Sequence, residues 1–227
     1  MESHELLETF RCDVVDDVEP YLWSNSEVYQ YINDAYFMFV RLTGGISDAT
    51  SDVTRLTATQ GEATTALHSS IMRIRKATNV TDANHTIRVI NTQDVDNLVD
   101  DDYGVLRSIN QIDTPGTVRY MVIGEEDELV RWVNVPDATV EVQLVVERLP
   151  LVRITGKRQK FIGVREEHHY HFLKWVRHLA YRKQDADTFN LAKSDQERDD
   201  FVAYCDMARQ EKGTRRHRVR TTGYGGI

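Results

Sequence analysis

The sequence predicts an α+β fold, with N- and C-terminal helices forming a helical bundle and an antiparallel β domain inserted between them. Apolar residues recur at helical spacing near both ends of the chain, while the middle alternates apolar and polar residues between turn signals. The N-terminal helices alone are too short to bury a core. We therefore expect a bundle of residues 1–48 and 163–212, a β domain of residues 49–162 and an extended tail of residues 213–227.

Two helices are expected before the β region. The first, over residues 2–15, carries an apolar stripe of Leu6, Leu7, Phe10 and Val14. The second has a capping box of Ser24 and Glu27, with Trp23 placed to pack on Val28, and it should end at Gly44.

The middle of the chain predicts a module of five to seven strands. The expected strand segments are residues 70–75, 85–90, 117–123, 129–135 and 139–148. In the last segment, Val142 and Leu144 fall on one face, while Glu141 and Glu147 fall on the other. This alternation is typical of a strand with one buried face.

Helical spacing returns after Gly163. We expect one helix over residues 166–183, a break at residues 185–187, and a last helix over residues 188–212 that Gly213 ends.

Composition limits the class of protein. The chain has 227 residues, a net charge of -8 and no apolar run approaching the roughly 18 residues of a membrane span. Glu2, Glu5 and Glu8 stand where a secretory signal would carry positive charge, so we expect synthesis in the host cytoplasm. Cys12 and Cys205 are expected to be buried free thiols.

The charge is unevenly distributed. Residues 213–227 contain four arginines and no acid, so the tail is +4 and the remaining residues sum to -12. A basic appendage on an acidic body is typical of a segment that docks on a negative surface and orders only there. The candidate partner-binding residues are Arg215, Arg216, Arg218 and Arg220, with Tyr224 and Ile227 as apolar anchors.

Catalytic and metal-binding alternatives find less support. His168 and His171 have spacing that could bring them to one ion, and acidic loops at residues 13–19 and 94–102 could attract calcium, but neither loop has the ligand order of an EF-hand. Motifs for a nucleophile elbow, a phosphate-binding loop or a dinucleotide fold are missing from the sequence. We expect no catalytic residue, metal or cofactor, although a hydrolase using the 94–102 loop is a testable alternative.

Four short motifs, in this order, resemble those of the head-to-tail adaptor (connector) proteins of tailed phages. They are Leu22-Trp23-Ser24 with residues 28–35, Glu147-Arg148-Leu149-Pro150, residues 179–189, and the arginine-rich end closing on Tyr224-Gly225-Gly226-Ile227. The resemblance covers nearly the whole chain. It implies a helical bundle carrying a β domain, a dodecameric ring below the portal, and a C-terminal extension along portal subunits.

The expected function is therefore that of a structural virion protein in the neck, which joins the portal protein to tail or nozzle proteins. The ring would leave a channel through which DNA passes without sequence-specific binding, and no membrane would be involved. The alternative is a nucleic-acid-binding accessory protein that uses the basic tail, for which binding should weaken steeply with salt.

Overall fold

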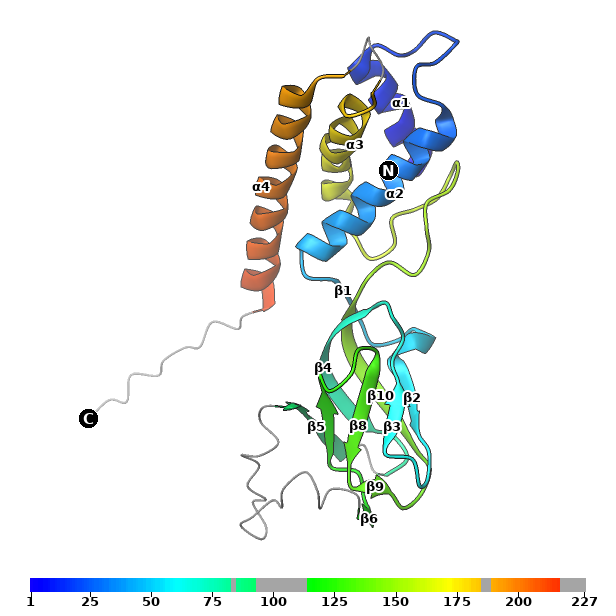
Figure 1. Ribbon diagram of the computed structural model, residues 1–227, viewed down its shortest axis with the longest axis vertical. Coiled ribbons are helices and arrows are strands. Elements are labelled where there is room, and N and C mark those ends of the chain that lie inside the picture. The colour runs from blue at the N-terminus through cyan, green and yellow to red at the C-terminus, as the bar shows by residue number, and fades with distance from the viewer. Residues whose placement is uncertain (83–84, 93–113, 185–188, 217–227) are drawn as a thin grey trace, which may run out of the picture. The chain divides into compact units, whose positions relative to one another are not determined.

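A computed structural model describes residues 1–82, 85–92, 114–184 and 189–216 (Figure 1). The chain divides into two compact units. The helical unit joins Met1–Gly45 to the segment that begins at Pro150, and the β unit is Ile46–Leu149. No helix in the described part of the chain is long and apolar enough to cross a membrane. The expected mixed α and β class is confirmed.

Helix α1 spans Ser3–Val14 and begins with a capping box that the sequence analysis missed. The backbone amide of Glu2 donates to the Glu5 carboxylate at 2.6 Å, and the Glu2 side chain accepts from the N3 backbone. Leu6, Leu7 and Phe10 are buried as their spacing predicted. The helix ends where the next residue takes a left-handed conformation, with φ of 57°.

The connection from α1 to α2 is organised by one buried arginine. The guanidinium of Arg11 donates to the Asp16 carboxylate at 2.7 Å, to the Trp23 carbonyl at 2.9 Å and to the Asn25 side chain at 2.7 Å. Asp16 in turn accepts from the Leu22 amide at 2.8 Å. Asp16, one of the acidic residues of the 13–19 loop, is therefore part of a satisfied buried ion pair and is only 8% exposed.

Helix α2 spans Asn25–Leu42 and begins at the predicted N-cap. The Ser24 hydroxyl accepts from the Glu27 amide at 3.3 Å. The Glu27 carboxylate, which was expected to complete a capping box, instead accepts from the Lys183 ammonium and the Tyr31 hydroxyl, both at 3.0 Å. The Glu27 carboxylate thus forms a tertiary ion pair instead of capping the start of α2.

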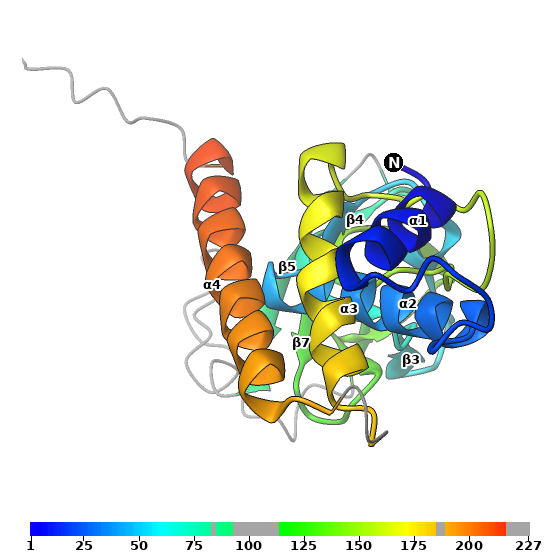
Figure 2. The same ribbon diagram turned by 90° about the horizontal axis from the view of Figure 1, so that it is seen from above.

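Helix α3, Phe172–Tyr181, follows a 3-10 turn at Glu166–His171 and lies between α2 and α4 (Figure 2). Helix α4 spans Leu191–Arg216. Phe172 of α3 packs against Phe39 of α2, with ring centroids 5.3 Å apart, and Trp175 packs against Phe201 of α4 at 5.1 Å. These aromatic contacts contribute to the packing between the helices.

The β unit contains ten strands in its described residues. Their bounds are Ile46–Asp48 (β1), Arg55–Ala58 (β2), Thr64–Ala66 (β3), Ile71–Asn79 (β4), His85–Asn91 (β5), Pro115–Gly116 (β6), Tyr120–Ile123 (β7), Leu129–Val133 (β8), Val135–Pro136 (β9) and Val140–Arg148 (β10). A short 3-10 turn, Asp52–Thr54, precedes β2.

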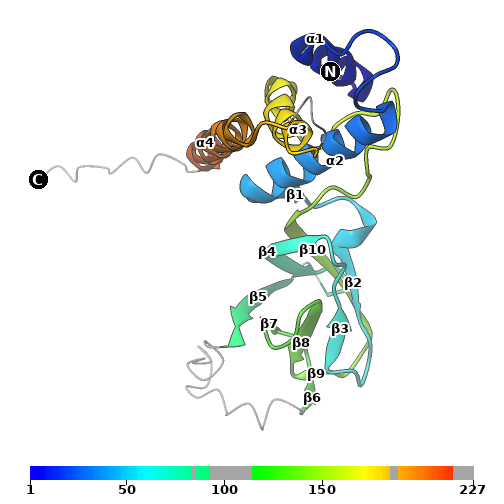
Figure 3. The same cartoon turned by 45° about the horizontal axis from the view of Figure 1, so that its top comes forward.

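Most of these strands form one curled sheet in the order β1-β10-β4-β5-β7-β8-β3, with β2 also paired to β10 (Figure 3). Most strand pairs are antiparallel, as expected for this domain, but two pairs depart from that expectation. Strands β5 and β7 pair in parallel, as do β6 and β9. A parallel pair needs a crossover connection rather than a hairpin between its strands, and alternation within each strand does not predict which kind of pair forms.

The hydrophobic core of the β unit lies on the inner face of the sheet. It includes Trp132, Met121 and Leu144, each 0% exposed. The alternation predicted for β10 holds through Val146, which is 0% exposed, although register shifts with β4 occur at Val145/Val146 and Glu147/Arg148. These irregularities bury Glu147 and Arg148, which pair with Arg75 at 2.8 Å and with Asp48 at 2.5 Å. The simple two-residue period could not predict this.

Candidate functional site

The predicted partner-binding segment begins on helix α4 rather than after it. The expectation that Gly213 ends the helix is wrong, because α4 continues to Arg216. Gly213 does not adopt the left-handed conformation that favours a glycine stop, and a Cβ there would meet open space. The Thr214 hydroxyl donates to the Gln210 carbonyl at 3.1 Å within this last turn.

One lysine links the last turns of α4 to the residues that follow α2. The Lys212 ammonium donates to the Thr43 carbonyl at 3.3 Å, the Gly44 carbonyl at 3.5 Å and the Gly45 carbonyl. These carbonyls belong to the C-cap residue of α2 and the two residues after it, where the negative end of the helix dipole favours a cation. The Lys212 clamp, as we call this contact, ties the end of α4 to the end of α2.

Arg215 is the one predicted site residue whose side chain the structure describes. It is half exposed and lies 3.5 Å from Glu167 and 3.6 Å from Glu211. Exposed ion pairs of this length contribute about 0–1 kcal/mol. Arg215 can therefore exchange these carboxylates for a carboxylate of a partner protein at little cost in free energy. Arg216 lies in the last turn of α4, and Arg218, Arg220, Tyr224 and Ile227 lie outside the described residues.

The histidines considered as metal ligands serve the packing of α4. His168 Nδ1 lies 2.9 Å from the Tyr204 hydroxyl, and the His171 ring stacks on the Tyr204 ring at 3.5 Å. Burial lowers the pKa of both His168 and His171. Among the described side chains, no group of three His, Cys, Asp or Glu could hold a metal ion. The acidic segment 94–102 lies outside the described residues.

Another part of the α3–α4 interface, nearer the start of α4, is also polar. His178 Nδ1 lies 2.9 Å from the Ser194 hydroxyl, which donates to the His178 carbonyl at 2.9 Å. Arg177 makes a bidentate pair with Glu197, at 2.8 and 3.0 Å, and reaches Asp13 of α1 at 2.7 Å. These contacts hold α4 in place upstream of the Lys212 clamp.

The two cysteines differ in environment. Cys205 is buried on α4, and burial raises its thiol pKa to about 12, so it stays protonated and unreactive. Cys12 is exposed, contrary to the prediction, because it lies on the solvent side of α1.

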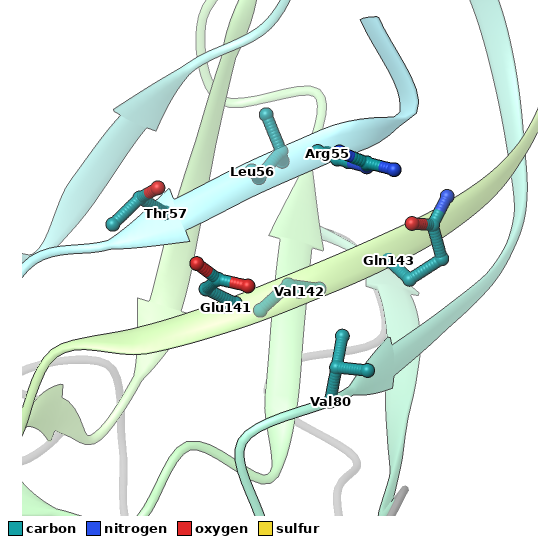
Figure 4. Close-up of a pocket in the computed structure, with 7 residues that line it drawn as sticks. All are labelled: Arg55, Leu56, Thr57, Val80, Glu141, Val142 and Gln143. Atoms are coloured by element: carbon teal, nitrogen blue, oxygen red, sulfur yellow. The ribbon is translucent and has the colours of Figure 1, made fainter. Parts of the chain in front are cut away.

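The β unit has a surface hollow of about 520 Å³ over β2 and β10, edged by Val80 (Figure 4). Thr57 lies opposite Glu141 in the register, and Arg55 lies opposite Gln143. The Gln143 amide donates to the Thr54 hydroxyl at 2.7 Å. The hollow thus lies on the solvent side of the sheet, with Arg55, Thr57 and Glu141 all exposed.

Three contacts could not be predicted from the sequence: the Lys212 clamp, the hydrogen bonds of Arg11, and the packing of Tyr204 against His168 and His171. The first two involve single charged residues whose partners are distant backbone carbonyls or loop groups, and no spacing rule marks them. Residues 150–165 contain several cations and no acid, which marks this segment in the sequence as a candidate binding surface.

No curated protein sequence matches the chain. A profile of the family described as SU10 adaptor protein matches residues 3–222. Because this match spans nearly the whole chain, the protein belongs to the SU10 adaptor family, a phage head-to-tail adaptor family as its motifs predicted.

Proposed function

We propose that the protein is a structural subunit of the phage neck that binds below the portal and connects it to tail or nozzle proteins. Family membership over residues 3–222 is the observation that carries this proposal. In it, copies of the chain close into a ring, twelve by the family resemblance, around a channel that DNA crosses without sequence-specific binding. The helices of the two chain ends act as one bundle in this ring.

The C-terminal segment is the portal-binding element in this proposal. The Lys212 clamp and the polar α3–α4 interface give α4 a fixed end, from which Arg215 and the following residues begin. Arg216, Arg218 and Arg220 would meet acidic groups on the portal, and Tyr224 and Ile227 would fill apolar sites there. Several such arms acting together would make a stable joint even if each binds weakly.

We also propose that the protein is not an enzyme. Among the described residues, several polar groups that could have served catalysis have structural roles instead. Arg11 and Asp16 organise a loop, and His168 and His178 hold α4 through Tyr204 and Ser194. An active site would need such groups to be available to a substrate.

The test removes residues 217–227 and leaves Lys212 and Arg215 in place. We expect the shortened chain to keep its far-UV circular dichroism spectrum and melting temperature but to lose binding to purified portal rings in sedimentation and electron microscopy. A full-length Thr221→Ala/Thr222→Ala variant, which keeps every arginine, is the matched control and should bind normally. Normal decoration of portals by the shortened chain would contradict the assignment.

The same proteins test the accessory nucleic-acid reading. If the full chain, but not the shortened one, binds duplex DNA at physiological salt and ignores portal rings, the basic segment is a DNA-binding element. Affinity should then fall steeply with salt, because each phosphate contact releases counterions.

A further inference from the structure

Helix α4 contacts the rest of the helical unit along a narrow stripe. Ser194, Phe201, Cys205 and Ala208 are buried on this stripe. The residues about half a turn away point outward and are exposed, namely Asp199, Ala203, Asp206, Met207 and Gln210. We call this set the outward α4 face. It carries two carboxylates and no cation, and Met207 is 49% exposed.

A second surface has the opposite charge. Residues 150–165 contain five Lys and Arg residues and no acid. Arg153, Lys157, Arg158 and Lys160 are exposed and form no ion pair with a carboxylate of the described chain. Val152 and Ile162 beside them are 54% and 60% exposed. We call residues 151–162 the basic loop.

The basic loop is held in one conformation by contacts with α1 and α2. The Ser3 amide donates to the Gln159 carbonyl at 2.9 Å, and the Ser3 hydroxyl donates to the Gly156 carbonyl. The Ile154 amide donates to the Asn33 side chain at 2.8 Å, and the Tyr36 hydroxyl donates to the Ile162 carbonyl. Its cations and apolar side chains are therefore positioned before any partner arrives, which reduces the entropy lost on binding.

The two surfaces lie on opposite sides of the helical unit. In Figure 2, α4 lies on one side of α3, and the yellow-green basic loop runs past α1 and α2 on the other side; Figures 1 and 3 agree. Surfaces that are complementary and lie on opposite sides of a subunit join copies head to tail, and such contacts form a ring when the rotation between successive copies closes.

We propose that the basic loop of one copy docks on the outward α4 face of the next copy in the ring. This inference rests on the proposed function and names the partner of each surface. Lys157 and Arg158 meet Asp199 and Asp206, while Val152 and Ile162 cover Met207 and Ala203. Asp199 already accepts from its neighbour Arg198 at 3.0 Å, but that pair is exposed and weak, and Asp206 forms no ion pair with the described cations.

Exposed apolar side chains favour a protein over a nucleic acid as the partner of the basic loop. Protein interfaces combine an apolar centre with arginines, whereas phosphate contacts need cations alone. A second copy is also favoured over an unrelated acidic protein. In a ring, every neighbouring subunit presents the outward α4 face, which has both the carboxylates and the apolar side chains that complement the basic loop.

The test uses charge reversal with the full chain and purified portal rings. Lys157→Glu/Arg158→Glu and Asp199→Lys/Asp206→Lys should each raise the protein concentration needed to complete rings by about ten-fold or more, because like charges then face each other. Combining all four substitutions in one chain should restore assembly to within about three-fold of the natural protein. The control variant, Arg73→Glu/Lys76→Glu in the β unit, changes the net charge by the same amount as Lys157→Glu/Arg158→Glu. It should assemble normally.

A mixture of the two double variants gives a second, independent readout. Each variant alone meets like charges, but an alternating ring pairs natural with natural surfaces and reversed with reversed surfaces. Equal amounts of the two should therefore assemble where neither does alone, which also shows that both variants are folded. Assembly unaffected by either reversal, or no recovery in both the quadruple variant and the mixture, would overturn the proposal.

Two other results have separate meanings. Failure of the natural protein to decorate portals would contradict the proposed function itself rather than this pairing. Loss of duplex DNA binding by Lys157→Glu/Arg158→Glu with ring assembly unchanged would overturn the pairing and make the basic loop a phosphate-binding surface.

Discussion

The Lys212 clamp makes a quantitative prediction about the end of α4. Replacing Lys212 with methionine keeps the length and apolar stem of the side chain and removes the ammonium that binds carbonyls at Thr43, Gly44 and Gly45. The carbonyls at the end of α2 then lose the cation that binds them. Because this contact joins two helices distant in sequence, its loss should loosen the last turns of α4 before anything else.

The magnitude follows from the number and exposure of the bonds. A hydrogen bond involving a charged group contributes about 1.5–3 kcal/mol, and the Lys212 side chain is half-buried, so water can replace part of what is lost. We expect K212M to lower the free energy of unfolding by about 1–2 kcal/mol. Lys212→Arg should recover part of this, because its charge remains while its planar geometry differs.

Urea unfolding measures the total effect, and amide hydrogen exchange locates it. Exchange should accelerate over residues 208–216, with little change in α3. Arg209→Met, on the exposed side of the same helix, is the control and should change the free energy of unfolding by less than about 0.5 kcal/mol. A K212M protein with unchanged stability and exchange would refute the view that this ammonium anchors α4.

Three further outcomes follow from the same structure. Gly213→Ala should stabilise the protein by about 0.5–1 kcal/mol in urea unfolding, since the position is helical and open; destabilisation would show that the helix stops there. Asp48→Asn should cost about 3 kcal/mol or more by leaving the buried Arg148 without its carboxylate, whereas Asp52→Asn on the neighbouring turn should be nearly neutral. The histidines beside Tyr204 have a lowered pKa in the folded protein, so their contribution is present above about pH 6.5 and declines as the pH falls below that value. The urea midpoint should therefore drop between pH 7.5 and pH 5.5, and a double His168→Gln/His171→Gln variant should show a smaller drop; equal drops would contradict this assignment.

Local sequence signals predicted much of the fold. The apolar stripe of α1, the Ser24 cap of α2 and the alternation through Val146 all appear as expected, because each depends on neighbours close in sequence. The described strands β1, β2 and β3 were not predicted, since each has only three or four residues and takes its place from pairing with β10 or β8.

The predictions of how helices begin and end failed where distant contacts decide the structure. Glycine was expected to end α4 at residue 213, but the helix continues to Arg216. The Lys212 clamp and the ion pairs of Arg215 lie in this last part of the helix. Similarly, Glu27 suits a capping box by spacing, yet Lys183 holds its carboxylate. Helix propensity and capping rules are weak compared with such tertiary interactions.

Electron cryo-microscopy of the assembled neck offers the most direct test of the proposed joint between subunit and portal. The account predicts that residues 217–227 of each subunit lie against a portal subunit, with Arg218 and Arg220 facing portal carboxylates. Finding those residues packed on the subunit that carries them, with no portal contact, would contradict it.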